Sequence, residues 1–244
     1  MIKIDHHNHI WTGNAVGEDF LDQDMSVEGL LRSMDADGLD MAGVCSIAQD
    51  IQNDYVAESV RKHPDRLFGV CFVDPRDKNA VNTLRRYLDM GMRGLKLHPR
   101  LHGFPFSSHK LVDPLMAVCE EYDVSVFGHG GNEEFNMPFD FEEMARTFPK
   151  VKVIIGHLGA PGAVDSAIMA AARTPNLYLD ASLCSLGNLR VAIRKASPEK
   201  VLMGADWPDG NFKIEMLKVE LAAQGNQHIF NEVAGGTAKR IYKL

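Results

Sequence analysis

Two histidines and an aspartate stand where a metal ion could be held. His7 and His9 are separated by one residue in a short β-rich run, and alternate residues of a strand point to the same face. Both imidazoles can therefore converge on one ion. Imidazoles completed by a carboxylate such as Asp206 suit Zn²⁺, with Fe²⁺, Mn²⁺ or Co²⁺ as substitutes. The pattern predicts a metal site.

Two more histidines precede glycines. They lie in the runs His129-Gly130-Gly131 and His157-Leu158-Gly159. A lone buried histidine is more often a satisfied core residue than a ligand. Because both of these end predicted strands, we favour a functional role for both. His6, next to His7, is predicted to point the other way and to pack beneath the helices.

Lys96 shares a strand face with His98, while its neighbours Leu95 and Leu97 occupy the opposite face. If His98 faces a barrel interior, Lys96 places an ammonium there, which is costly unless it is paired. Three explanations remain open for Lys96: a salt bridge, a grip on an anionic substrate, or a carbamate that bridges two metals. We rank the third below the other two. His98 either lines a pocket or supports Lys96.

The elements that must position these residues alternate regularly along the chain. Strands are expected over 2–10, 41–47, 66–73, 93–98, 124–129, 151–157, 176–180 and 200–205. Helices are expected over 26–34, 50–62, 77–90, 111–122, 139–148, 163–173, 186–196 and 213–223. Strand ends recur about every 28 residues, close to the ~30 of a minimal βα unit.

This rhythm predicts an α/β protein with a single (β/α)8 TIM barrel, a parallel eight-stranded sheet and one domain spanning residues 1–244. An open doubly wound sheet would favour a glycine-rich turn after the first strand, where the chain has His7-Asn8-His9. Barrel active sites lie at the carboxyl ends of the strands. Five of the ten histidines fall there together with Asp206.

Charge and composition exclude several classes of function. The net charge of −7 disfavours nucleic-acid partners. No apolar run approaches the roughly 18 residues that span a membrane. The opening residues lack the features of a signal peptide, so we expect a cytoplasmic protein.

The segment after residue 98 bears on the substrate. Lys96, Arg100 and His102 put basic groups at the end of the fourth strand and after it, which favours a small anionic substrate, although a solvated loop explains Arg100 and His102 equally well. Trp11 is expected near the same rim. We assign Lys96, His98, Arg100 and Trp11 to substrate binding.

The ordered motifs resemble the amidohydrolase superfamily, specifically its amidohydrolase 2 branch of TIM-barrel metal-dependent hydrolases. The tail has Thr237 where that family usually has asparagine. The matching segments are 4–11 (IDHHNHIW), 94–99 (GLKLHP), 128–131 (GHGG), 155–159 (IGHLG), 204–208 (GADWP) and 235–242 (GGTAKRIY).

The resemblance implies a residue-by-residue assignment. His7, His9, His129 and Asp206 would hold one divalent metal, with zinc expected first. Asp206 would also move the proton between water and the leaving group. His157 would assist beside the water or join a second metal site bridged by carbamylated Lys96, an arrangement that we rank below a single metal. Homo-oligomerisation is a further expectation from the resemblance.

Three functions follow in order. The first is a metal-dependent hydrolase that cleaves a small carboxylate-bearing amide, lactone or ester. The second is a metal-dependent non-oxidative decarboxylase of an aromatic or unsaturated acid. The third is a barrel that binds a ligand without catalysis, which would predict a missing metal ligand or acid/base carboxylate. Neither is missing from the sequence.

Overall fold

The computed structural model describes residues 2–13, 24–131, 133–160 and 162–244. All of its strand pairs are parallel, and they form a three-stranded sheet, β1-β2-β3, and a six-stranded sheet, β4-β5-β6-β7-β8-β9. The strands are β1 (Ile4–His9), β2 (Met41–Cys45), β3 (Leu67–Gly69), β4 (Cys71–Phe72), β5 (Gly94–Leu97), β6 (Ser125–Gly128), β7 (Val153–Ile155), β8 (Leu177–Asp180) and β9 (Val201–Leu202).

The two sheets are joined by backbone contacts outside the paired strands. β3 and β4 flank Val70, whose N–H donates to the carbonyl of Val44 at 2.9 Å, and together they correspond to the single third strand expected over 66–73. On the other side, an isolated parallel bridge pairs Asn8 with Trp207. The eight-strand barrel predicted from the βα rhythm is thus confirmed as the fold.

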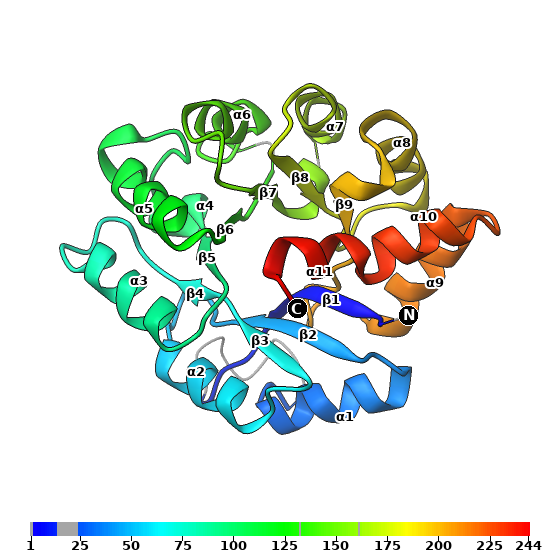
Figure 1. The fold of residues 1–244 in the computed structure, drawn as a ribbon, viewed down its shortest axis with the longest axis horizontal. Helices are drawn as coiled ribbons and strands as arrows, with labels where there is room; N and C mark the ends of the chain where they lie inside the picture. Colours follow the sequence, from blue (N-terminus) through cyan, green and yellow to red (C-terminus); the bar gives the residue numbers. More distant parts are fainter. Residues whose placement is uncertain (1, 14–23, 132, 161) are drawn as a thin grey trace.

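Helices surround the strands (Figure 1). Local chemistry sets several of their ends: the Ser26 hydroxyl caps α1, which ends at Gly38 with a left-handed φ of 68°. The helices are α1 (Val27–Asp37), α2 (Asn53–Lys62), α3 (Ala80–Asp89), α4 (Pro99–His102), α5 (His109–Tyr122), α6 (Pro138–Thr147), α7 (Val164–Arg173), α8 (Leu186–Ala196), α9 (Phe212–Ala223), α10 (Gln227–Asn231) and α11 (Thr237–Tyr242).

The barrel interior has its own apolar cluster, which excludes water beneath the rim that carries the histidines. The carboxyl-terminal helix α11 lies across the strands in Figure 1, and Tyr242 from it reaches this cluster. The Tyr242 hydroxyl is 3.2 Å from Nδ1 of His6. The cluster consists of Ile4, Met41, Cys45, Phe68, Val70, Phe72, Phe127, Ile154, Leu202, Ala238, Ile241 and Tyr242.

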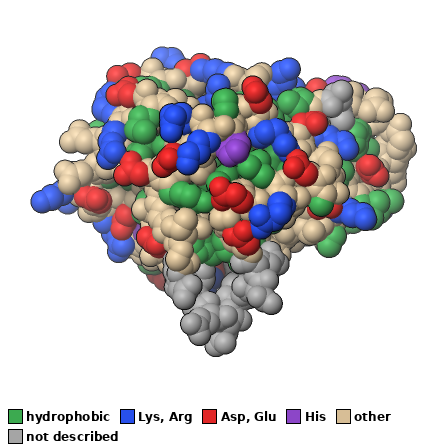
Figure 2. All heavy atoms as spheres, turned by 90° about the horizontal axis from the view of Figure 1, so that it is seen from below, with side chains coloured by type: hydrophobic (Ala, Val, Ile, Leu, Met, Phe, Trp, Pro, Cys, Tyr) green, Lys and Arg blue, Asp and Glu red, His purple; other side chains and the backbone are tan. Residues whose placement is uncertain are grey.

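The outer surface mixes charges of both signs. Figure 2 shows Lys and Arg side chains interspersed with Asp and Glu on the face that is lowest in Figure 1. Within the described residues, no helix is long and apolar enough to cross a bilayer.

Candidate metal centre

Three side chains from the two ends of the chain meet at one rim of the barrel. Nε2 of His7 lies 3.0 Å from Oδ1 of Asp206, and Nε2 of His9 lies 3.1 Å from the same oxygen. The two Nε2 atoms are 3.3 Å apart. Each residue therefore directs one ligand atom toward a common point, as a metal site requires.

The charge balance of this cluster suits a cation. Nδ1 of His9 lies 2.6 Å from the backbone oxygen of Ser46 and donates to it, which leaves Nε2 as the nitrogen that faces Asp206. Burial lowers the pKa of His9, whereas Cys45 and Asp206 oppose it and raise it to about 10. A positive charge is thus stabilised at this point, and a divalent metal can replace the proton. The residues fit such a metal.

Asp206 presents a carboxylate with two separate roles. Burial raises its pKa, but His7 and His9 outweigh burial and hold the pKa well below its usual range. Oδ1 faces those two histidines, while Oδ2 lies 3.9 Å from Nε2 of His157. The second oxygen is therefore placed to take a proton from a reacting group.

The first strand carries its histidines on an irregular backbone. The register between β1 and β2 shifts between Asp5 and Asn8, and the buried Asp5 carboxylate accepts from the backbone N–H of His7 at 3.0 Å. Because of this bulge, the prediction that His6 points away from His7 is wrong. Both rings face Asp180, His6 through Nε2 at 3.1 Å and His7 through Nδ1 at 2.9 Å.

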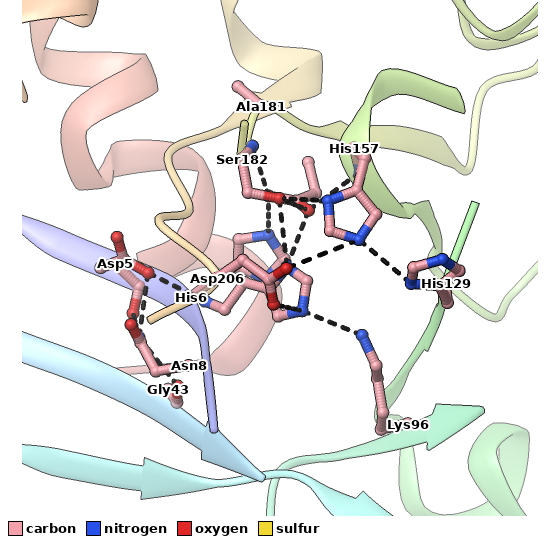
Figure 3. Close-up of polar contacts among 12 residues, drawn as sticks. Asp5, His6, Asn8, Gly43, Lys96, His129, His157, Ala181, Ser182 and Asp206 are labelled. Atoms are coloured by element: carbon pink, nitrogen blue, oxygen red, sulfur yellow. Dashed lines mark hydrogen bonds and ion pairs between the residues drawn. The ribbon is translucent and has the colours of Figure 1, made fainter. Parts of the chain in front are cut away.

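His129 lies beside the three-residue cluster. Its Nδ1 is 3.1 Å from Nε2 of His157, and its ring stacks on His98 with centroids 4.0 Å apart. Burial, with His98 and His157, lowers the pKa of His129 well below its usual value, so the ring is neutral. Figure 3 shows His157 between His129 and the Asp206 side of the site. His129, the predicted fourth ligand, is therefore not one of the three residues whose ligand atoms converge, and it contacts the site through His157.

Asp180 and Ser182 are site residues that the sequence analysis missed. The Asp180 carboxylate is fully buried and accepts from Nδ1 of His7 at 2.9 Å and from the Ser182 hydroxyl at 2.6 Å. Ser182 also lies 2.9 Å from Nδ1 of His157. The signal was present in the sequence, because Asp180 ends a predicted strand as His129 and His157 do.

Lys96 is buried next to the cluster. Its Nζ is 3.0 Å from Nε2 of His7 and 3.6 Å from the ring centroid of Phe127. Burial lowers the pKa of Lys96, and burial with Lys96 lowers that of His7 to about 3. In the part of the chain that the structure describes, Lys96 pairs with no carboxylate. A salt bridge therefore does not explain the buried amine.

Two site residues have strained backbones. His157 has a φ of 54° and Asp206 a φ of 57°, both in the left-handed region that non-glycine residues rarely adopt. Hydrogen bonds hold each in place: the His157 N–H donates to Asp180 at 3.1 Å, and the Asp206 N–H donates to the carbonyl of His7 at 2.8 Å. The surrounding structure thus fixes the direction of both side chains.

A cavity of about 270 Å³ opens beside the cluster. Of the four residues predicted to bind substrate, Trp11, Lys96 and His98 line it. Arg100 does not: its side chain is 61% exposed and pairs with Glu133 at 2.8 Å. The full lining is His9, Trp11, Ile47, Ala48, Gln49, Lys96, His98, Leu101, His129, Asp206, Pro208 and Asp209.

Comparison with known sequences supports the assignment made from the motifs. The family model described as amidohydrolase matches residues 4–244. A search of curated proteins found no significant sequence match.

Solved structures share the fold at low sequence identity. A 2,6-dihydroxybenzoate decarboxylase from Rhizobium superimposes with a TM-score of 0.81 at 16% identity, over 100% of this chain and 99% of its own. A dihydroxybenzoic acid decarboxylase from Polaromonas sp. JS666, solved with bound manganese, gives 0.79 at 16% identity over 100% and 97%. A probable 2-pyrone-4,6-dicarboxylic acid hydrolase from Acinetobacter baumannii gives 0.74 at 14% identity over 100% of both chains.

Proposed function

The chain belongs to the amidohydrolase family, and we propose that it is a metal-dependent hydrolase that cleaves a small carboxylate-bearing amide, lactone or ester. The single observation that carries this proposal is the Asp206 carboxylate. One of its oxygens meets the Nε2 atoms of His7 and His9, while the other is 3.9 Å from Nε2 of His157. One group is thus placed to hold a metal and to move a proton.

We assign the metal to His7, His9 and Asp206, with His129 as the fourth ligand and zinc as the first candidate. When bound, such a metal makes water more acidic and draws electron density from a carbonyl oxygen that it contacts. The remaining steps belong to the protein.

Asp206 accepts the proton of the attacking water through Oδ2. The water oxygen forms a bond to the substrate carbonyl carbon, and the bond from that carbon to nitrogen or oxygen breaks. Asp206 then returns the proton to the leaving atom, so its carboxylate is regenerated. His157, fixed by its backbone and by Ser182, holds its Nε2 beside Oδ2 of Asp206, where it can accept a hydrogen bond from the protonated carboxyl group.

The cavity supports a small anionic substrate. Its volume of about 270 Å³ lies just below the roughly 300–1,000 Å³ of ordinary ligand pockets. Trp11 and Leu101 supply apolar walls, and the buried Lys96 ammonium supplies the positive charge. Arg100 would need to leave Glu133 to contact a ligand here, so we assign the anion to Lys96.

Decarboxylation is the second candidate. Two structures that share the fold are named as decarboxylases of dihydroxybenzoic acids, and one is named as a probable hydrolase. A carboxylate bound beside the metal and Lys96 could lose CO₂ if the ring carbon that it leaves were protonated. Asp206 is again the nearest proton carrier.

The test uses the full chain loaded with Zn²⁺ or Mn²⁺. One panel contains carboxylate-bearing amides, lactones and esters, and a second contains aromatic and unsaturated carboxylic acids. Product mass and CO₂ release are followed on both panels. We expect metal-dependent hydrolysis without CO₂. CO₂ release without hydrolysis would replace the proposal by the second candidate, and a metal-loaded chain inactive on both panels would contradict catalysis of either kind.

A further inference from the structure

We propose that Asp180 and Ser182 are positioning residues that set the tautomers of His7, His157 and His129, so that each neutral ring carries its lone pair on Nε2 and the Nε2 lone pairs of His7 and His129 are left for a metal. The inference rests on the proposed function only in that a metal and its water use those lone pairs. The hydrogen-bond chain itself is a property of the protein alone.

Asp180 is the fixed end of the chain. Its carboxylate is fully buried and receives four donors: the Ser182 N–H at 3.0 Å, the Ser182 hydroxyl at 2.6 Å, the His157 N–H at 3.1 Å and Nδ1 of His7 at 2.9 Å. Nε2 of His6 faces the same group at 3.1 Å. Such an ionised carboxylate accepts and never donates, so every proton in these contacts must come from the partner.

The first arm of the chain ends at His7. Because Asp180 can only accept, the proton between the two groups belongs to Nδ1 of His7. The other nitrogen of that neutral ring, Nε2, then carries the lone pair. It is this atom that lies 3.0 Å from Oδ1 of Asp206 and 3.3 Å from Nε2 of His9.

The second arm begins at the Ser182 hydroxyl, which has a single hydrogen. Its oxygen lies 2.6 Å from Oδ2 of Asp180, a separation that requires a shared hydrogen, and only Ser182 can supply it. Toward Nδ1 of His157, at 2.9 Å, the Ser182 oxygen must therefore accept. Neutral His157 is then protonated on Nδ1 and has its lone pair on Nε2.

The chain continues from His157 to His129. Nε2 of His157 and Nδ1 of His129 are 3.1 Å apart, and a hydrogen bond there needs one proton. Since His157 offers a lone pair, His129 must donate from Nδ1. Nε2 of His129 is left unprotonated, on a residue that lines the cavity. Figure 3 shows Ser182, His157 and His129 in this order.

This hydrogen-bond chain matters for metal binding. A neutral imidazole in the wrong tautomer presents an N–H group to the metal and cannot ligate it. Partners that orient ligating histidines typically contribute 10–100-fold in metal affinity. Of these three rings, the Asp180 carboxylate contacts His7 directly and reaches His157 and His129 through the Ser182 hydroxyl. Nδ1 of His7 contacts Asp180 at 2.9 Å and the Ser182 hydroxyl at 3.2 Å, so without Ser182 it still has the carboxylate as acceptor. Loss of Ser182 should therefore change the tautomers of His157 and His129 but not that of His7, which a merely structural role does not predict.

The measurement is long-range ¹H–¹⁵N correlation spectroscopy of the histidine rings in metal-free, ¹⁵N-histidine-labelled full chain, at about pH 8, above the ordinary imidazole pKa. Single histidine-to-glutamine variants assign the signals. We expect the wild-type protein to carry the proton on Nδ1 in His7, His157 and His129.

Ser182→Ala is the decisive variant, because it removes the second arm and leaves Asp180 in place as the acceptor for Nδ1 of His7. We expect the Nε2-protonated form to appear in His157 and His129, and metal affinity to fall by roughly 10–100-fold. Ser182→Thr, which keeps the hydroxyl, should restore both. Ser59→Ala is the matched control: it deletes a buried serine hydroxyl that donates to the carbonyl of Tyr55 at 2.8 Å in α2, and should leave tautomers and affinity as in wild type.

A second variant, Asp180→Ala, tests the first arm by releasing His7. If that variant does not fold, Ser182→Ala still decides the case. An Nε2 proton on His157 or His129 in the wild-type protein would overturn the proposal. So would unchanged tautomers in Ser182→Ala with a metal affinity within about twofold of wild type.

The tautomer measurement and the activity measurement test the two proposals independently. Because tautomers are measured without metal or substrate, a chain with the expected tautomers that turns over nothing would retain the positioning chain and reject hydrolysis. A chain that hydrolyses its substrate with an Nε2 proton on neutral His157 would retain the proposed hydrolysis and reject the positioning chain.

Discussion

Oδ2 of Asp206 and Nε2 of His157 face each other at 3.9 Å. Both residues have left-handed backbones, which hydrogen bonds to other parts of the site hold in place. This distance is slightly longer than a hydrogen bond. The two groups therefore do not hydrogen-bond to each other, and each can interact with a substrate. The carboxylate can exchange a proton with a substrate, and Nε2 of His157 is placed to accept a hydrogen bond from Asp206 once that group is protonated.

Asp206→Asn removes the proton carrier while keeping its shape. We expect kcat on the best substrate to fall by about 10²–10⁴-fold, which is the usual contribution of a positioned acid or base. Steady-state kinetics with saturating metal measures this. A variant that binds metal and substrate yet turns over at the wild-type rate would show that the proton travels by another route.

Lys96→Met separates two accounts of the buried amine. As an ammonium 3.0 Å from a ligating imidazole, Lys96 repels a metal and attracts an anion. The variant should bind one metal at least as tightly as wild type, with a KM raised tenfold or more, about 1.4 kcal/mol. Metal titration and kinetics measure the two effects. Loss of a second equivalent of metal would instead support a carbamate bridge.

His98 and His129 stack on each other, but we assign His98 to substrate binding and His129 to metal binding. His129→Ala should weaken metal binding by at least about 100-fold, since it removes a direct ligand. His98→Ala should act mainly on KM, because His98 lines the cavity and its Nδ1 accepts from the backbone of Leu101 at 3.3 Å. Titration of both metal-free variants compares them. Equal losses of affinity would contradict this division.

Glu142 provides a test of stability away from the site. It is buried and binds Arg173 at 2.8 Å and Arg146 at 2.6 Å, and these arginines lower its pKa to about 2, with Arg173 the larger cause. Because the folded pKa lies below the unfolded value, the stabilisation is present above about pH 4.5 and is lost as the pH falls through about 2.

Glu142→Gln should therefore lower the free energy of unfolding by roughly 1.5–3 kcal/mol at neutral pH, and the deficit should narrow below about pH 4.5. Urea unfolding across this range measures it. Glu58→Gln, on an exposed pair with Lys62 at 2.9 Å, is the control and should leave the free energy of unfolding unchanged within error. A deficit that stays constant with pH would argue against an ionised Glu142.

The order of elements was predictable because each βα unit carries a local signal. The apolar runs that end at His129 and His157 predict strands. Helix α8 begins and ends at the predicted residues 186 and 196. The division of the third strand at Val70 was not predictable, since it depends on pairing with β2 on one side and β5 on the other.

The site was partly predictable for the same reason. His7, His9 and Asp206 converge because strand ends of a barrel share one rim. The orientation of His6 was wrong because strand alternation assumes a regular backbone, and β1 is bulged. Asp180 ends a predicted strand, as the site histidines do, but its partners His7 and His157 come from two distant segments of the chain, so its contacts could not be inferred from a local pattern.

Metal content tests the central claim most directly. The purified chain is stripped with a chelator and then titrated with Zn²⁺ or Mn²⁺ while bound metal and turnover are followed. The account predicts about one equivalent of tightly bound metal, with activity rising in proportion to occupancy. Less than about a tenth of an equivalent, with no activation by either ion, would contradict it.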